Sequence, residues 1–340
     1  MSGEGPLEEV GAMTKADFVT DQVVRWCPGC GDYSILAQMQ KVLPTLGVAR
    51  ENIVFVSGIG CSSRFPYYVN TFGFHTIHGR APAIATGLKI ANPDLSVWVI
   101  TGDGDGLSIG GNHLIHAMRR NLDINILLFN NGVYGLTKGQ YSPTSEFGKV
   151  TKSSPVGTIE APINPTSIAI AAEASFVART ADVDPRHLAT TLEQAAAHKG
   201  TSFVEILQNC IIFNDKTHDP FLARSVRNER ILYLEDGKPM VFGTDHPRGI
   251  GTDGFTPKVV EETEQGLLVH QPGLLSAAQA YMISQLTYPE FPVPMGVFRR
   301  VPRATYEDLA HGQVADAVKR AGGPGDLGQL LKGRGSWTVT

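Results

Sequence analysis

Four short runs of almost purely apolar residues constrain the fold of this chain most strongly. Runs of this length suit parallel strands that are buried on both faces of a sheet. Stretches with the apolar spacing of helices lie between and around them. Strands that alternate with helices predict an α/β fold, with a doubly wound, mainly parallel sheet and helices on both faces. The predicted strands are Ile53–Val56, Val97–Ile100, Ile124–Phe129 and Phe203–Leu207, and the predicted helices are Tyr33–Leu43, Ala81–Ala91, His113–Arg120, Ser167–Ala174 and Pro185–His198.

The chain divides into three predicted parts. Residues 1–20 are expected to form an N-terminal arm, and residues 21–222 are expected to form one domain that contains the sheet. Charged, Pro and Gly residues become frequent after this domain, so residues 223–340 are predicted to form an irregular C-terminal extension. Within the extension, a hairpin-like pattern spans Ile231–Phe242 and a helical pattern spans Leu274–Leu286.

Composition and charge argue against several classes of protein. The net charge of −4 disfavours a general nucleic-acid binder, which needs a basic face. No apolar run approaches the roughly 18 residues of a membrane span, so no membrane partner is expected. The polar, acidic start of the chain lacks a secretory signal, which predicts a cytoplasmic location. Charged residues make up 18%, below an average of about 25%, so we expect a partner to cover part of the surface.

Two polar segments follow two of the predicted strands at their carboxyl ends, where ligands of such sheets bind. Residues 102–104 read Gly-Asp-Gly, and residues 130–133 read Asn-Asn-Gly-Val. Either segment alone fits a simple turn, but the pair at two strand ends predicts a site for Mg²⁺ and a diphosphate, because Mg²⁺ prefers oxygen ligands. The candidate ligands are the Asp103 carboxylate, the Asn131 amide oxygen and the Val133 carbonyl, and Gly102 and Gly104 would let the main chain approach the diphosphate.

The four cysteines form a second constellation. In a reducing compartment, free, metal-bound or catalytic thiols are expected rather than disulfides. Cys27 and Cys30 flank Pro-Gly, a knuckle that turns two thiolates toward one metal, and Cys61 and Cys210 follow later in the chain. Four thiolates match either Zn²⁺ or an iron–sulfur cluster. A redox-active dithiol, or small core residues at 61 and 210, are the alternative interpretations.

These segments together resemble a known family. The metal segments resemble the thiamine diphosphate signature, and the cysteine pattern resembles the β subunits of 2-oxoacid:ferredoxin oxidoreductases. The resemblance covers residues 20–222. Besides the metal segments, it is carried by residues 26–31 (Trp-Cys-Pro-Gly-Cys-Gly), 60–64 (Gly-Cys-Ser-Ser-Arg), 78–81 (His-Gly-Arg-Ala) and 134–140 (Tyr-Gly-Leu-Thr-Lys-Gly-Gln).

The resemblance implies a thiamine-diphosphate-binding fold and a set of cofactors. These are thiamine diphosphate, Mg²⁺ and a [4Fe–4S] cluster, with coenzyme A as co-substrate. The cluster would be held by Cys27, Cys30, Cys61 and Cys210, and the Mg²⁺ by Asp103, Asn131 and the Val133 carbonyl. The residues implied at thiamine diphosphate are Gly60, Cys61, Ser62, His78, Gly102, Asp103, Gly104, Asn131, Val133, Gly135 and Leu136.

Four side chains are candidates for the substrate pocket. Arg64 could bind the substrate carboxylate in bidentate fashion, although from the residues alone it could also form a surface ion pair. The resemblance places His78 near the cofactor, where it could hydrogen-bond to substrate. It also places Leu136 and Lys138 at the border of the pocket, where Lys138 could pair with a second, distal carboxylate. With Arg64, these residues resemble the 2-oxoglutarate-using branch more than the pyruvate-using branch.

The implied reaction is the oxidative decarboxylation of 2-oxoglutarate to succinyl-CoA, or its reverse, with electrons passing through the cluster to ferredoxin. The chain supplies only one diphosphate-binding half. The resemblance therefore implies an α subunit that carries the aminopyrimidine-binding domain and an activating Glu, in an (αβ)2 assembly. Two alternatives remain open. One is a pyruvate-using or broad-specificity 2-oxoacid enzyme, and the other is a non-redox thiamine diphosphate enzyme with structural zinc.

Overall fold

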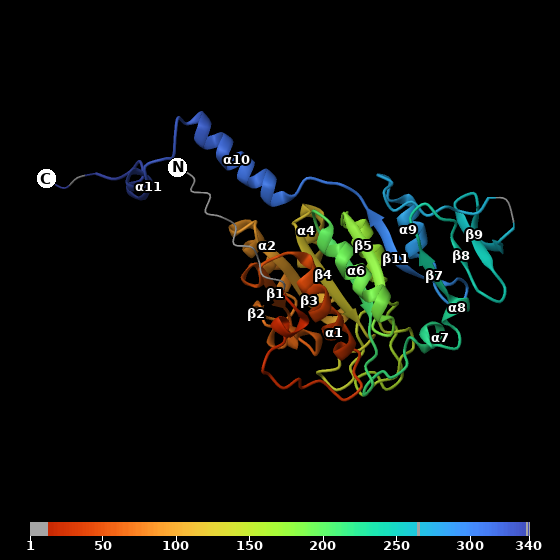
Figure 1. Cartoon of the computed structure of the whole chain (residues 1–340). Coiled ribbons are helices and arrows are strands. Elements are labelled where there is room, and N and C mark those ends of the chain that lie inside the picture. Colours follow the sequence, from red (N-terminus) through yellow and green to blue (C-terminus); the bar gives the residue numbers. More distant parts are fainter. Residues whose placement is uncertain (1–12, 264–265, 338, 340) are drawn as a thin grey trace.

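An eight-stranded sheet forms the centre of the molecule (Figure 1), with strand order β2-β1-β3-β4-β6-β5-β11-β7. The computed structural model describes residues 13–263, 266–337 and 339. Neighbouring strands are parallel, except that β11 runs antiparallel to β5. The predicted doubly wound α/β fold is therefore confirmed. The strands of this sheet are β1 Ile53–Ser57, β2 Phe72–His75, β3 Ser96–Gly102, β4 Ile124–Asn130, β5 Phe176–Ala181, β6 Ser202–Leu207, β7 Ile231–Leu234 and β11 Val293–Arg300.

Helices cover both faces of the sheet, and each face has its own hydrophobic core. Successive side chains of a strand point to opposite faces. In β1, Val54 and Val56 enter a core with α2, α4, α5 and α9, whereas Ile53 and Phe55 enter a core with α1 and α6. Because both faces are covered, the strands read as continuous apolar runs. The helices are α1 Asp32–Val42, α2 Ala81–Ala91, α3 Asp103–Leu107, α4 Gly111–Arg120, α5 Pro165–Ala171, α6 Pro185–Ala197, α7 Asp219–Leu222, α8 Arg227–Arg230, α9 Ala278–Ser284, α10 Tyr306–Arg320 and α11 Leu327–Lys332.

Three strands of the main sheet, β2, β5 and β11, were not predicted. In β5, Arg179 interrupts the apolar pattern, yet it is buried because its Nε donates to Glu205 Oε2 of β6 at 2.7 Å. All residues of β2 are exposed, because β2 is the edge strand of the sheet. A buried ion pair and an exposed edge both remove the apolar signal on which strand prediction depends.

The C-terminal third is more regular than the sequence predicts. The hairpin expected over residues 231–242 is wrong: β7 pairs with β11 in the main sheet, and the next strand joins a separate antiparallel sheet. The predicted helix at 274–286 is confirmed as the shorter α9. The boundary after residue 222 stays a prediction, although strands from both sides of it share the main sheet. The small sheet consists of β8 Val241–Phe242, β9 Arg248–Asp253 and β10 Thr256–Glu261.

The two ends of the chain extend the sheet domain differently. Residues 1–12 of the predicted N-terminal arm lie outside the described residues, and the short 3-10 helix Lys15–Phe18 buries Phe18 completely. At the other end, α10 and α11 project away from the sheet (Figure 1). Among the described helices, none has the length and apolar character needed to cross a bilayer.

Candidate active site

The carboxyl ends of β1, β3 and β4 meet at one edge of the sheet. β3 and β4 pair with Gly102 opposite Phe129, so the two predicted metal segments begin side by side. The chain leaves β1 for β2 on one side and passes from β3 to β4 on the other, which makes a topological switch between β1 and β3. Ligands of α/β sheets bind at such a switch point.

Asp103 begins α3 at this edge and is almost completely buried, with 2% of its surface exposed. Its Oδ2 accepts hydrogen bonds from Ser142 Oγ at 2.6 Å and Thr144 Oγ1 at 2.5 Å. Among the described residues, no basic side chain forms an ion pair with Asp103. Burial raises the pKa of Asp103, although these two hydrogen bonds act to lower it. A buried carboxylate in this setting is stabilised by a bound cation, and its hard oxygen ligand suits Mg²⁺.

The two asparagines after β4 differ in their contacts. Asn130 anchors the loop, because its Nδ2 donates to the ion-paired Glu205 at 2.7 Å and its Oδ1 accepts from Gly132 N at 3.3 Å. The amide of Asn131 is oriented by Nδ2, which donates to Gln208 Oε1 at 2.8 Å. No described residue donates a hydrogen bond to the Val133 carbonyl. The predicted Mg²⁺ ligands therefore fit this geometry, and their roles stay predictions.

All four cysteines line one cavity of about 200 Å³, which also includes Asn131 and Gly135 in its wall. The thiols are free. Burial raises the pKa of Cys61 to about 11 and raises the pKa of Cys30 further. A Cβ on Gly135 would lie 3.4 Å from Cys61 Sγ and 3.8 Å from Cys210 Sγ, so this glycine packs directly against two of the thiols.

Two kinds of metal centre, a zinc ion and an iron–sulfur cluster, use four thiolates. Within the described ranges, no three Cys, His, Asp or Glu side chains lie close enough to hold one metal ion. A tetrahedral zinc site needs every thiolate within about 2.3 Å of the same ion. In an iron–sulfur cluster the thiolates bind different irons, so they stand further apart around a larger group. All four thiols line this one cavity, and both the zinc ion and the iron–sulfur cluster stay predictions for it.

Gln208, which the sequence analysis missed, connects the two predicted centres. Its side chain is buried, and its Oε1 accepts from Asn131 of the metal segment. Its Nε2 lies 3.3 Å from Cys30 Sγ and donates to Asn209 O at 2.7 Å. One amide therefore contacts both the metal segment and a cysteine of the cavity. Nothing in the local sequence distinguishes this glutamine, which follows β6 without a motif.

Asp105, the second carboxylate of the Gly-Asp-Gly-Asp-Gly segment, is a further residue that the sequence analysis missed. It is 2% exposed, and its Oδ1 accepts from Ile59 N at 3.0 Å and Gly79 N at 2.7 Å. His78 Nδ1 lies 2.7 Å from the same oxygen, so Nδ1 carries the proton and Nε2 is left for a ligand. Thr101 Oγ1 donates to Oδ2 at 2.6 Å. Asp105 thus orients His78 and joins the loops after β1 and β2 to strand β3 at the sheet edge.

Asp105→Ala is expected to lower the free energy of unfolding by about 3–5 kcal/mol, because it leaves buried donors without an acceptor. Thr101→Val, the matched control, removes only one of these hydrogen bonds and is expected to cost about 1–2 kcal/mol. Denaturant unfolding of both variants measures the difference. Equal stabilities of Asp105→Ala and the unaltered protein would contradict this role.

The remaining predicted residues lie at different depths. Ser62 is buried, and its Oγ would lie 3.6 Å from a Cβ on Gly102, which brings the cysteine loop against the metal segment. Gly60 has a positive φ of 123°, and Gly104 leaves no room for a side chain because its Cβ would lie 2.2 Å from the Tyr134 ring. Arg64, Leu136 and Lys138 are exposed. Arg64 and Leu136 line the cysteine cavity, whereas Lys138 does not.

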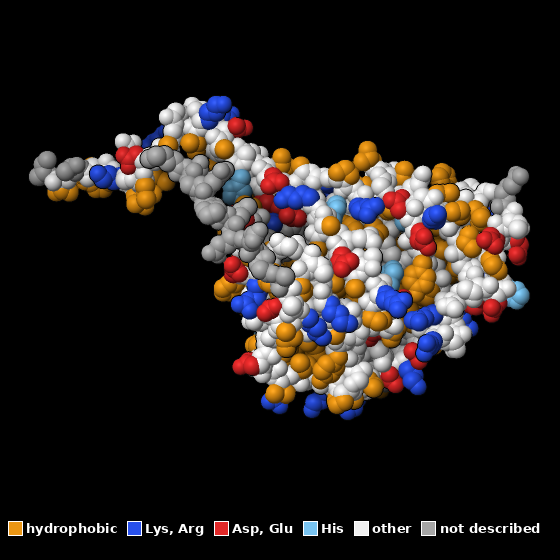
Figure 2. All heavy atoms as spheres, viewed as in Figure 1, with side chains coloured by type: hydrophobic (Ala, Val, Ile, Leu, Met, Phe, Trp, Pro, Cys, Tyr) orange, Lys and Arg blue, Asp and Glu red, His pale blue; other side chains and the backbone are white. Residues whose placement is uncertain are grey.

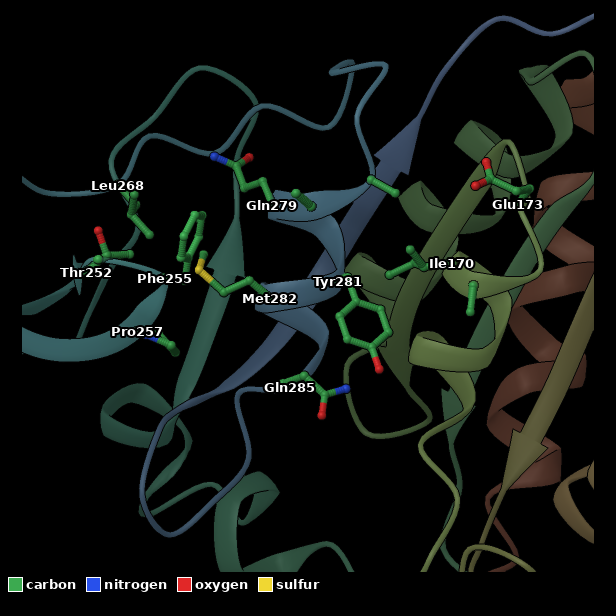
Figure 3. A pocket seen from close by; sticks show the side chains of 14 residues that line it. Ile170, Glu173, Thr252, Phe255, Pro257, Leu268, Gln279, Tyr281, Met282 and Gln285 are labelled. Carbon is green, nitrogen blue, oxygen red and sulfur yellow. The ribbon is translucent and has the colours of Figure 1, made fainter.

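A larger pocket lies elsewhere and contains none of the predicted site residues. Its volume is about 730 Å³, and it lies between α5, α9 and the β9–β10 turn. Figure 3 shows Phe255, Tyr281 and Met282 around it. It has no cluster of polar groups suited to a diphosphate or a metal, so the candidate active site is the sheet edge described above.

Relatives of known family match most of the length of the chain. Residues 58–206 match the family model of the thiamine pyrophosphate enzyme C-terminal TPP binding domain. The 2-oxoacid:ferredoxin oxidoreductase 1 subunit beta of Aeropyrum pernix is 49% identical over 221 residues, 65% of this chain and 68% of that protein. The 2-oxoglutarate oxidoreductase subunit KorB of Mycobacterium tuberculosis is 53% identical over 328 residues, 95% of this chain and 88% of that protein. The chain belongs to the 2-oxoacid:ferredoxin oxidoreductase β subunits.

The fold of this β subunit agrees with a solved relative. A 2-oxoglutarate:ferredoxin oxidoreductase from Magnetococcus marinus, with 2-oxoglutarate, coenzyme A and succinyl-CoA bound, superposes with a TM-score of 0.75 at 30% identity. The match covers 95% of this chain and 97% of the other chain. The family resemblance inferred from the motifs is therefore confirmed, and it extends beyond residue 222 into the C-terminal third. As a member of this family, the β subunit is part of an oxidoreductase with a thiamine diphosphate domain.

Proposed function

We propose that this β subunit supplies the diphosphate-binding half and the electron-transfer centre of an enzyme that converts 2-oxoglutarate and coenzyme A to succinyl-CoA and CO₂. Ferredoxin accepts the electrons, and the reverse reaction uses the same groups. The names of the M. tuberculosis and M. marinus relatives support the choice of 2-oxoglutarate. A pyruvate-using or broad-specificity enzyme is the alternative.

The main support for this proposal is the buried side-chain amide of Gln208, which contacts both predicted centres. Gln208 contacts Asn131 at 2.8 Å and Cys30 Sγ at 3.3 Å. A thiamine enzyme without redox chemistry needs no such proximity. An enzyme that passes electrons from a thiamine-bound substrate to a cluster needs the two groups close together.

The residues of the chain take distinct roles in this proposal. When bound, thiamine diphosphate supplies the nucleophilic carbon and the electron sink for decarboxylation. Asp103, Asn131 and the Val133 carbonyl hold the Mg²⁺ that binds the diphosphate, and the glycines at 102 and 104 let the backbone approach it. His78, fixed by Asp105, presents Nε2 to the substrate.

The cysteine side of the site has its own roles. Cys27, Cys30, Cys61 and Cys210 hold a [4Fe–4S] cluster as thiolates, and the charge of the cluster offsets the burial that raises the pKa of the Cys30 and Cys61 thiols. Gly60 and Ser62 flank Cys61 in its loop, and Ser62 brings this loop against the metal segment at Gly102. Gly135 and Leu136 separate the cluster from the substrate side.

The proposal includes a partner α subunit that brings the aminopyrimidine-binding domain and an activating Glu, in an (αβ)2 assembly in the cytoplasm. Free thiols at the site support a reducing compartment. Exposed apolar residues in the loop after β4 support a covering partner: Phe147 is 67% exposed and Val156 is 96% exposed. Figure 2 shows hydrophobic side chains gathered over the loop-bearing edge at the bottom of the view.

The assembled enzyme, purified without oxygen, tests this function. Reduction of ferredoxin is measured with 2-oxoglutarate, 2-oxobutyrate and pyruvate, each with and without coenzyme A. We expect kcat/KM for 2-oxoglutarate to exceed that for pyruvate at least about tenfold, because a second carboxylate can be bound, and we expect no reduction without coenzyme A. Release of CO₂ without electron transfer would instead support a non-redox thiamine enzyme.

A further inference from the structure

A second cavity, of about 520 Å³, adjoins the cysteine cavity on the substrate side. The two cavities share three lining residues, Arg25, Arg64 and Leu136. Lys138, the second cation expected from the sequence, lines neither of them. Its backbone has a positive φ of 68°, and its side chain is exposed. The cation that accompanies Arg64 in these cavities is therefore Arg25.

The charges around the second cavity are unbalanced. Neither the Arg25 nor the Arg64 guanidinium forms an ion pair or a hydrogen bond within the described part of the chain. The other titratable side chains at its wall are Asp21, whose Oδ1 accepts from Gln22 Nε2, and His75 with Tyr67 and Tyr68 beside it. His75 Nδ1 lies 2.9 Å from Ser63 O, so Nδ1 carries a proton and donates it to this carbonyl. Two guanidiniums facing one carboxylate leave a positive charge for an anion.

The backbone holds both arginines against the cysteine loop. Tyr68 Oη accepts from Arg25 N at 2.9 Å, and Trp26 Nε1 donates to Cys61 O at 2.7 Å. The same Cys61 carbonyl accepts from Arg64 N at 3.2 Å. The Cys61 carbonyl therefore ties the segment of Arg25 and Trp26 to the segment of Arg64, and both arginines line both cavities.

Arg64 lies on the inner side of this pair. The short helix Ser62–Tyr67 that carries it begins at Ser62, which lies against the metal segment at Gly102. Arg25 comes from the outer segment, whose Thr20 hydroxyl bonds to Tyr67 O at 3.0 Å. Leu136 lines both cavities and presents an apolar surface that suits the methylene groups of a dicarboxylate.

We propose that Arg25 determines substrate specificity by binding the distal carboxylate of a dicarboxylic 2-oxoacid. This inference rests on the proposed function. Arg25 is a specificity residue in this proposal and is not among the predicted ligands of the metal or of the cluster. A monocarboxylic 2-oxoacid would place an alkyl group, and not a carboxylate, beside the Arg25 guanidinium.

The test compares Arg25→Gln, Arg25→Lys and the matched control Lys138→Gln in the assembled enzyme. We expect Arg25→Gln to lower the ratio of kcat/KM for 2-oxoglutarate to that for 2-oxobutyrate about ten- to hundredfold, the effect of one lost charge-assisted hydrogen bond. Arg25→Lys should restore part of the ratio, and Lys138→Gln should leave it unchanged. Thiamine diphosphate, iron content and the KM for coenzyme A should stay unchanged in all three.

Two results would overturn the assignment: a ratio that is unchanged in Arg25→Gln, whether or not both rates fall together, or a ratio that falls in Lys138→Gln instead. A raised KM for coenzyme A with an unchanged ratio would also overturn it and would assign Arg25 to a phosphate. Calorimetric binding of glutarate, which has two carboxylates but cannot react, separates this inference from the reaction. If the unaltered enzyme oxidised neither 2-oxoacid, the proposed function would fail. The role of Arg25 would still be decided by whether Arg25→Gln, but not Lys138→Gln, loses glutarate binding.

Discussion

Asp103→Ala is expected to abolish binding of thiamine diphosphate to the assembled enzyme. The diphosphate and Mg²⁺ bind as one unit, and Asp103 supplies the only carboxylate among the predicted Mg²⁺ ligands. Its removal leaves the cation with neutral ligands, and we expect at least about a hundredfold loss of affinity, or ~3 kcal/mol. Cofactor released from gel-filtered protein and quantified by fluorescence measures the loss.

Two features make this experiment decisive. Asp94→Ala, which removes an exposed carboxylate in the turn before β3, is the matched control and should bind the cofactor normally. The iron content of Asp103→Ala should stay close to that of the unaltered enzyme, because Asp103 does not line the cysteine cavity. Full cofactor content in Asp103→Ala would refute the assignment of Asp103 to the metal.

Cys61→Ser is expected to remove the cluster while thiamine diphosphate stays bound. A hard serine oxygen then replaces a soft thiolate, and the serine oxygen binds iron poorly. Ferredoxin reduction should fall at least about a hundredfold, and the electron paramagnetic resonance signal of the reduced cluster should disappear. The same outcome is expected for Cys27→Ser, Cys30→Ser and Cys210→Ser.

Cys210 is the most informative of the four, because no motif surrounds it in the sequence. It lies beside Gly135, and its Sγ would be 3.8 Å from a Cβ there. A normal signal and normal ferredoxin reduction in Cys210→Ser would make it a cavity-lining residue without a ligand role. The other three cysteines would then need a different fourth ligand.

Patterns that depend on local spacing were readable from the sequence. The apolar runs predicted β1, β3, β4 and β6, because their side chains are buried on both faces. The strand ends then located Asp103 and Asn131 at the same sheet edge. These inferences need only the geometry of a parallel sheet.

Features that depend on distant pairs were not readable. β5 was missed because Arg179 is buried only through Glu205, a residue 26 positions away. Asp105 had no predicted role, because its partners come from the loops after β1 and β2 and from strand β3. Arg25 and Gln208 lie outside any motif, and only the folded chain brings them to the cavities. Each of these roles arises from tertiary contacts that no local pattern encodes.

The metal content of the assembled enzyme tests whether the four cysteines hold a [4Fe–4S] cluster or a zinc ion. Iron, acid-labile sulfide and zinc are measured in anaerobic enzyme and in Cys61→Ser, and the difference per β subunit removes any contribution from the partner. We expect the unaltered enzyme to be brown and to exceed the variant by about four iron and four sulfide, as a [4Fe–4S] cluster requires. A difference of about one zinc, with no iron or sulfide, would refute the cluster and leave a thiamine enzyme with a structural metal.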